Sequence, residues 1–259
     1  MSLNVAAPRI SWRHATVIEV VPETPRTRTL VLDVPEWPGH RAGQHVDVRL
    51  TAEDGYQAER SYSIASPPEE PRLSLTVERL KDGEVSPYLS DELRSGDKLE
   101  LRGPIGGYFV WDISLSGPLL LVGGGSGIVP LMAMLRHRNA ALAAANMERH
   151  LMPARLLYSS RGWDEVIYRD ELARLADSDR TLEVRHTLTR DQPAGWTGFR
   201  RRIDRAMLEE ISWPPSEQPR VFVCGPTPLV EAVAQSLVEL GHQPALIKTE
   251  RFGPTGGSV

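Results

Sequence analysis

The chain contains 259 residues with a single cysteine and a formal net charge of −4. A mildly acidic chain without a block of basic residues is a poor nucleic-acid binder, because neutralising phosphates needs a concentrated basic face. One cysteine excludes an internal disulfide framework and any iron–sulfur cluster held by four thiolates. The first residues lack the apolar core of a secretory signal, so we expect a cytoplasmic protein.

In the first part of the chain, up to residue 112, apolar and polar residues alternate with a period of two, which predicts half-buried strands. Turn pairs such as Asp54-Gly55 and Asp82-Gly83 separate these runs. We expect strands near 14–21, 27–34, 46–50, 73–77 and 98–103, a further strand around Arg60, and one short helix over 86–94. This pattern is typical of a six-stranded antiparallel barrel.

After residue 117 the pattern changes to strands that alternate with helices. We expect strands at 118–122, 155–159, 181–187, 220–224 and 245–249, and helices near 129–143, 168–176, 203–210 and 227–240. This order predicts a five-stranded parallel sheet covered on both faces by helices, with ligands at the carboxyl ends of the strands. We therefore expect two domains, 1–112 and 113–259.

The run GPLLLVGGGSGIVPLMAML, residues 117–135, is the most apolar stretch of the chain. Its glycines and Pro130 divide it into a strand and a helix, which argues against a membrane span because lipid-exposed backbone must be hydrogen-bonded within its own element. A Rossmann fingerprint would need glycine at Ile128, and a nucleophile elbow built on Ser126 fails at the same residue. A nucleotide-binding loop and a tightly packed strand–helix turn both remain open.

Four short segments in order resemble the ferredoxin–NADP reductase family over nearly the whole chain. They are Arg60-Ser61-Tyr62-Ser63, Gly123–Gly127, Cys224-Gly225-Pro226 and Thr249-Glu250-Arg251-Phe252. The continuation Ile64-Ala65-Ser66 is more similar to the FAD-binding branch than to the FMN-binding one. The resemblance implies an FAD-binding barrel over 1–112 and an NAD(P)-binding domain over 113–259.

The resemblance also implies the flavin-binding residues. Arg60 would pair with the flavin diphosphate, a role that suits a guanidinium, Tyr62 would lie against the isoalloxazine, and Ser63 would offer a hydroxyl near its reactive nitrogen. Ser86 is expected to cap a helix whose amides face a phosphate. The implied FAD contacts are Arg60, Ser61, Tyr62, Ser63, Thr76, Val77, Glu78, Gly83, Glu84, Val85, Ser86 and Ser126. Glu78 stands where the family more often has a basic residue.

For the nicotinamide nucleotide, the implied contacts are Gly124, Gly125, Ser126, Gly127, Ser160, Arg161, Cys224, Gly225 and Pro226. Ser63, Cys224, Glu250 and Phe252 are the implied catalytic residues, and they would act by positioning nicotinamide and flavin for hydride transfer. Ser160 and Arg161 could hold a 2′-phosphate, which favours NADPH over NADH. No metal site is expected.

The sequence therefore predicts an FAD-dependent oxidoreductase that takes hydride from NAD(P)H and passes electrons to an iron–sulfur protein, either a ferredoxin or an oxygenase component. Because Cys224 is the only cysteine, the iron–sulfur centre would lie on another protein. Alternatives are the reduction of a small acceptor such as a quinone or ferric chelate, and a non-catalytic flavin- or nucleotide-binding regulatory module. A hydrolase built on Ser126 is the weakest option. Neither a nucleic-acid partner nor a membrane span is expected, and the oligomeric state stays open.

Overall fold

The computed structural model describes residues 10–144 and 152–252. Its first layer is an antiparallel sheet whose strand order is β4-β3-β6-β1-β2-β5. The strands are β1 (Trp12–Thr24), β2 (Thr27–Asp33), β3 (His45–Thr51), β4 (Gln57–Ser63), β5 (Leu73–Glu78) and β6 (Lys98–Ile105). An isolated antiparallel bridge between Ile64 and Leu75 joins the two edges. The predicted barrel is confirmed, including the strand around Arg60.

The alternating pattern explains why these segments form strands. Val46 and Val48 on β3 are fully buried and join Leu73, Leu75 and Val77 of β5 in one apolar core inside the barrel. Successive side chains of a strand point to opposite faces. The polar residues between these positions therefore face outward or toward the second half of the chain.

The second layer is a parallel sheet with the order β11-β10-β7-β8-β9. It comprises β7 (Leu119–Gly124), β8 (Ala154–Gly162), β9 (Leu182–Asp191), β10 (Arg220–Pro226) and β11 (Ile247–Phe252), with α1 (Ile128–Ala144), α2 (Arg169–Ser178), α3 (Arg205–Ile211) and α4 (Thr227–Glu239). Leu119 and Leu121 pack in the core that includes α1 and α2 residues, while Leu120 and Val122 pack with α3 and α4 residues. The sheet is thus covered on both faces, as predicted.

The apolar run 117–135 is resolved into three pieces. Strand β7 is buried along its whole length in the middle of the sheet, a short 3₁₀ turn spans Gly125–Gly127, and α1 then begins at Ile128 with Pro130 near its start. Proline is tolerated in the first turn of a helix because the amide there lacks an intrahelical acceptor. Within 10–144 and 152–252, no helix is long and apolar enough to cross a membrane.

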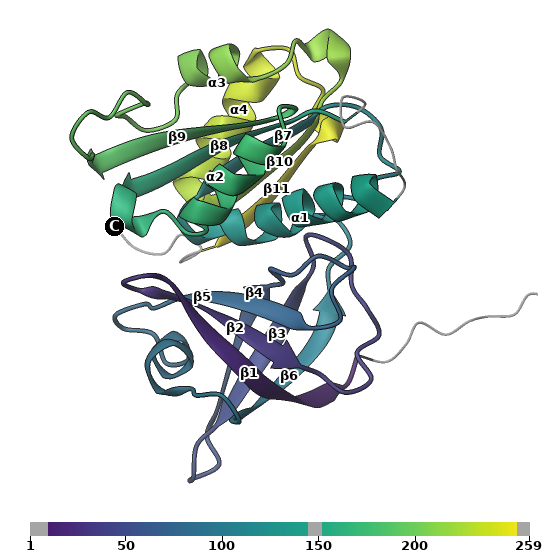
Figure 1. Cartoon of the computed structure of the whole chain (residues 1–259), viewed down its shortest axis with the longest axis vertical. Coiled ribbons are helices and arrows are strands. Elements are labelled where there is room, and N and C mark those ends of the chain that lie inside the picture. Colours follow the sequence, from purple (N-terminus) through teal and green to yellow (C-terminus); the bar gives the residue numbers. More distant parts are fainter. Residues whose placement is uncertain (1–9, 145–151, 253–259) are drawn as a thin grey trace, which may run out of the picture.

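Helix α1 is one of the elements that contact the barrel, which lies against the α1 and α2 side of the sheet (Figure 1). Ala42 and Ala65 of the barrel half pack into the same core as α1. The Arg136 side chain on α1 donates to the Ala65 carbonyl oxygen at 2.7 Å and pairs with Glu171 of α2. The two sheets are therefore joined by apolar packing and by hydrogen bonds.

Three local predictions differ from the structure. The helix expected over 86–94 is a single π-helical turn, Tyr88–Glu92. Ser86 does not cap it, because its hydroxyl accepts from the Leu80 amide instead. The last strand begins at Ile247, after a 3₁₀ turn opened by Pro244, and continues through Phe252, so that Glu250 lies inside the strand rather than at its end.

Candidate functional site

A cavity of about 680 Å³ opens between the barrel and the carboxyl ends of the parallel strands. Its walls come from both halves of the chain. Of the residues singled out from the sequence, it brings together Arg60, Ser61, Tyr62, Ser63, Thr76, Glu78, Gly83, Glu84, Val85, Ser86, Gly124, Gly125, Ser126, Ser160, Arg161, Pro226 and Phe252. Pockets that hold organic cofactors fall in this range of volume.

Five of the singled-out residues do not line this cavity: Val77, Gly127, Cys224, Gly225 and Glu250. Val77 is fully buried in the barrel core, because it lies on the opposite face of β5 from Thr76 and Glu78. Its side chain therefore does not face the cavity. The other four lie behind the lining, at the ends of β10 and β11 and at the loop that packs on them.

The glycine loop after β7 is shaped by close backbone contacts. A Cβ atom on Gly127 would lie 2.2 Å from the Cys224 carbonyl oxygen and 2.8 Å from the Gly225 nitrogen. Gly125 has a φ of 55°, in the left-handed region that glycine adopts without strain. The loop thus lies directly on the end of β10, and it exposes Gly124, Gly125 and Ser126 to the cavity.

Cys224 and Glu250 face each other across β10 and β11, where they are paired in register. The thiol donates to Glu250 Oε2 at 3.9 Å. Burial raises the pKa of the Cys224 thiol well above its usual range, and the neighbouring Glu250 carboxylate adds to this shift. Burial also raises the pKa of Glu250 to about 7. Near neutral pH the thiol is protonated and the carboxyl group is poised between its two forms.

On the barrel side, the Arg60 guanidinium is bound by two protein acceptors. Its Nη2 donates to Glu84 Oε2 and its Nη1 donates to the Glu59 carbonyl oxygen, both at 2.7 Å. The Tyr56 hydroxyl donates to the other Glu84 oxygen, Oε1, at 3.1 Å. Tyr62 is half-buried, and burial raises the pKa of its phenol to about 12. Its hydroxyl is therefore neutral throughout the physiological range.

Two site contacts could not be read from motifs. Tyr168, which precedes α2, is buried and its hydroxyl contacts the Thr76 hydroxyl across the two halves of the chain. Thr76 in turn lies 2.8 Å from the Thr29 hydroxyl, which donates to Glu23 at 2.7 Å. Burial raises the pKa of Glu23. Only the docking of the two sheets brings Tyr168 and Thr76 together, and no motif marks Thr29 or Glu23.

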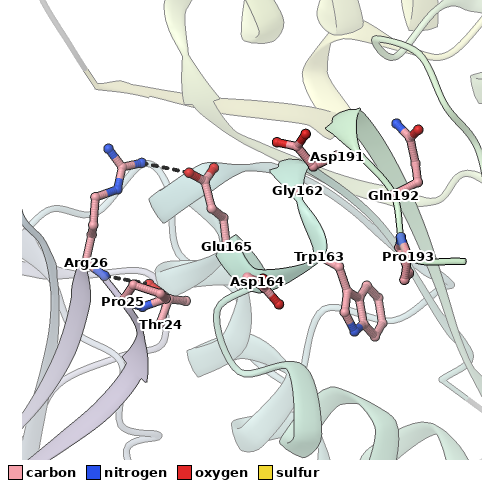
Figure 2. Close-up of a pocket in the computed structure, with 10 residues that line it drawn as sticks. All are labelled: Thr24, Pro25, Arg26, Gly162, Trp163, Asp164, Glu165, Asp191, Gln192 and Pro193. Carbon is pink, nitrogen blue, oxygen red and sulfur yellow. Dashed lines mark hydrogen bonds and ion pairs between the residues drawn. The ribbon is translucent and has the colours of Figure 1, made fainter.

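Arg26 is the second addition. It lies in the turn between β1 and β2 and lines both the large cavity and a neighbouring one of about 510 Å³. Figure 2 shows its guanidinium directed at Glu165, and the Nη2–Oε1 distance is 3.1 Å. The same nitrogen lies 3.7 Å from Glu78 Oε1. Glu78, expected to be an unusual acidic replacement, therefore pairs with a cation from a neighbouring strand turn.

At the other end of the cavity, Ser160 and Arg161 lie on β8 near its carboxyl end. The Ser160 carbonyl oxygen accepts from the Thr189 hydroxyl at 3.3 Å, which links β8 to β9. Arg161 is exposed, and it forms no ion pair with any residue in the described ranges. Of the described residues, three arginines thus line the cavity: Arg26 and Arg60 are paired with carboxylates, whereas Arg161 faces solvent.

Comparison with known proteins gives two family models that follow each other along the chain. The oxidoreductase FAD-binding domain matches residues 14–110, and the oxidoreductase NAD-binding domain matches residues 121–235. The first covers the barrel strands and the second begins within β7. The antiparallel sheet therefore matches an FAD-binding domain and the parallel sheet an NAD-binding domain, and the cavity lies between these two sheets.

Similar proteins include the ferredoxin–NADP reductase B of Sorangium cellulosum, 34% identical, with 92% of this chain and 97% of that protein aligned. The glycine betaine monooxygenase reductase subunit of Chromohalobacter salexigens is 32% identical over 93% of this chain. The chain spans only 64% of the length of that relative. The Amycolatopsis cytochrome P450 reductase GcoB superimposes with a TM-score of 0.79 at 27% identity, covering 95% of this chain and 71% of GcoB.

Proposed function

The chain belongs to the ferredoxin–NADP reductase family of FAD- and NAD-binding oxidoreductases, and on that premise we propose that it transfers hydride from NAD(P)H to FAD and passes the electrons to a redox partner protein. One observation carries this proposal. A single cavity is lined both by the half that matches the FAD-binding model and by the half that matches the NAD-binding model. Such a shared cavity would hold flavin and nicotinamide against each other.

The residues present fit a bound FAD. The turn before Ser86 is tight, since a Cβ on Gly83 would lie 2.8 Å from the Ser86 hydroxyl oxygen and 3.2 Å from Leu80 Cβ. Such a turn lets a phosphate approach the backbone closely. Arg60 supplies a guanidinium next to this turn, through its pair with Glu84. When bound, FAD supplies the redox chemistry by accepting a hydride and releasing electrons one at a time.

The protein's own residues then act by holding and orienting. Tyr62 and Phe252, from the two halves of the chain, provide aromatic surfaces for the flavin rings, and Ser63 offers a hydroxyl. Ser126 and the glycines before it, which line the cavity, would border the nicotinamide. Cys224 and Glu250 lie directly behind this loop, where the Cys224 thiol is protonated and donates to the Glu250 carboxyl group. Alignment of donor and acceptor at about 3–3.5 Å is the main catalytic contribution expected.

A direct experiment tests the function. The purified protein should carry FAD or bind it when the flavin is added, and the flavin absorbance should bleach when NADPH or NADH is supplied without oxygen. A protein that cannot be reconstituted with FAD, or whose bound flavin is not reduced by either nucleotide, would rule out the proposed activity.

For the electron acceptor, we propose an iron–sulfur protein, either a ferredoxin or the redox component of an oxygenase. The support is that Cys224 is the only cysteine of the chain, and that relatives are named as ferredoxin–NADP reductase and as the reductase subunit of a monooxygenase. Rates measured with a plant-type ferredoxin should exceed those with a quinone or a ferric chelate. Faster reduction of the small acceptors would favour the second candidate function, the reduction of small molecules.

For the nucleotide, we propose a preference for NADPH carried by Ser160 and Arg161. Arg161 lines the cavity without an ion-pair partner among the described residues, so its charge is free for a 2′-phosphate. Arg161→Ala should lower kcat/KM for NADPH about tenfold and leave that for NADH within about twofold, as expected for the loss of one charge-assisted phosphate contact. Arg180→Ala, at an exposed arginine outside the cavity, is the matched control. An unchanged NADPH preference in Arg161→Ala would show that Arg161 has no such role.

We further propose that the division at residue 112 separates an FAD-binding from an NAD(P)-binding domain. The matched ranges, 14–110 and 121–235, support it. A cytoplasmic location is proposed because the cytoplasm supplies reduced nicotinamide nucleotides. The role of residues 253–259 is left open, because they lie outside the described residues.

A further inference from the structure

The arginine assigned to the flavin diphosphate already binds a carboxylate and a carbonyl oxygen of the protein. Arg60 lines the cavity and its side chain is about half exposed, at 53%. One edge of its guanidinium donates to the Glu84 carboxylate and the other to the Glu59 carbonyl oxygen. A guanidinium recognises carboxylates and phosphates through the same planar set of donors. A phosphate that approaches the edge of the guanidinium bound by Glu84 therefore competes with that carboxylate.

Glu84 is held in this position by a second donor. The Tyr56 hydroxyl, from the turn between β3 and β4, donates to Glu84 Oε1 while Arg60 binds Oε2. This contact raises the pKa of the Tyr56 phenol, mainly through its hydrogen bond to the carboxylate. The carboxylate is thus oriented toward Arg60 from two sides. Among the described residues, Arg60 is the only cation that pairs with Glu84.

The position of Glu84 in the chain places its charge beside the phosphate-binding turn. It follows Gly83 directly and precedes Val85 and Ser86, and all four line the cavity. A diphosphate near this turn would approach a fixed carboxylate as well as the arginine. Like charges a few ångströms apart disfavour binding, and this repulsion is weakened but not removed by solvent.

We propose that Glu84 is an internal competitor for Arg60 that the FAD diphosphate displaces on binding, and that this competition lowers the affinity for FAD. The inference rests on the proposed function, because it takes Arg60 as the diphosphate-binding residue. It adds a determinant of flavin affinity that works against binding. Tyr56 strengthens the competitor by orienting it.

The experiment measures the Kd for FAD on flavin-free protein by the quenching of flavin fluorescence. Glu84→Gln should lower the Kd about threefold to fivefold, the upper part of the range expected when one exposed charge interaction is removed. Glu59→Gln is the matched control, because the Glu59 carboxylate pairs with Arg102 at 3.4 Å and not with Arg60. The Kd of this variant for FAD should stay within about twofold of that of the unmodified protein. Tyr56→Phe should lower the Kd by a smaller factor.

Arg60→Gln separates this inference from the proposed function. If Arg60→Gln weakens FAD binding and Glu84→Gln tightens it, both hold. If Arg60→Gln weakens binding while Glu84→Gln leaves the Kd unchanged or raises it, the competition is wrong and the role of Arg60 stands. If Arg60→Gln has no effect, or the unmodified protein binds no FAD, the assignment of Arg60 fails and the inference fails with it.

Discussion

At the scale of single residues, the chemistry of the site depends on burial more than on residue type. Glu250 is an ordinary glutamate in sequence, yet its place beside Cys224 in the sheet raises its pKa to about 7. Burial disfavours the charged form of a carboxyl group because the low-dielectric interior replaces water. The motif Thr249-Glu250-Arg251-Phe252 could identify the residue, but it could not predict this shift.

This shift makes stability depend on pH. The Glu250 pKa is about 7 when folded and 4.5 in its ordinary state, so the folded protein binds the extra proton. Its contribution to the free energy of unfolding is therefore fully present below pH 4.5 and is lost as the pH rises to about 7. Glu250→Gln removes the penalty of the buried charge. The variant should be about 1–3 kcal/mol more stable than the unmodified protein at pH 8, with a much smaller difference near pH 4.5.

Urea unfolding of the flavin-free protein at the two pH values measures this difference. Glu209→Gln, at an exposed glutamate on α3, is the control and should show no such dependence. A Glu250→Gln effect of the same size at both pH values would contradict the prediction.

At the scale of elements, the strands and helices could be predicted from the sequence wherever apolar residues recur at a regular spacing along a whole segment. Both sheets and the placement of most site residues around one cavity follow the expectation. The errors lie where side-chain hydrogen bonds or proline redirect the backbone. Ser86 braces the turn after Leu80 instead of capping a helix, and Pro244 delays the last strand. Where an element begins and which group a side chain binds depend on competing local contacts, and the spacing of apolar residues does not encode these contacts.

The face to which a side chain points is a second feature that a motif does not give. The resemblance implies flavin contacts for Thr76, Val77 and Glu78 alike, whereas the Val77 side chain lies in the barrel core, so that its contact with the flavin stays a prediction. Arg26 lines the cavity from a turn that carries no motif, and the contact of Tyr168 with Thr76 joins two distant parts of the chain. Local sequence predicts elements well, whereas contacts between distant elements require the assembled fold.

The glycine loop after β7 gives a prediction at this scale. Gly127→Ala places a Cβ 2.2 Å from the Cys224 carbonyl oxygen, and backbone at the end of a central strand cannot move away readily. The substitution should lower the free energy of unfolding by about 2 kcal/mol or more, as overpacking does. Urea denaturation followed by circular dichroism measures the change.

Gly107→Ala is the control, because its Cβ would meet only the Arg41 side chain at 3.8 Å. It should change stability by less than about 0.5 kcal/mol, as surface substitutions usually do. Equal effects from the two substitutions would show that the loop is not tightly packed on β10.

At the scale of the whole molecule, a small set of contacts fixes how the barrel meets the parallel sheet. Arg136 is central to them. It pairs with Glu171 through Nε at 2.8 Å and Nη2 at 2.6 Å, donates to the Ala65 carbonyl oxygen, and lies 4.8 Å from the Tyr168 ring centre. The Tyr168 hydroxyl reaches Thr76 on the cavity wall. The packing of the two halves thereby determines the shape of the cavity.

Removing Arg136 should therefore destabilise the molecule. Arg136→Ala leaves Glu171 and the Ala65 carbonyl oxygen without their donor in a largely buried interface. We expect a loss of about 2–4 kcal/mol, the effect of breaking a partly buried pair, which calorimetry would record as a thermal midpoint lower by about 5 °C or more. Arg174→Ala, at an exposed arginine on α2, should leave the midpoint nearly unchanged. A similar midpoint in both variants would contradict the role of Arg136.

The order of strands in the parallel sheet has a consequence for folding while the chain is being synthesised. Central strand β7 pairs with β8 on one side, but its other neighbour is β10, which begins at Arg220. That partner is synthesised roughly a hundred residues later, and pairings of such long separation form slowly. Until then, one edge of the most apolar strand in the chain is unpaired and open to other chains. We expect newly made protein to depend on chaperones during this interval, although the finished fold buries β7 completely.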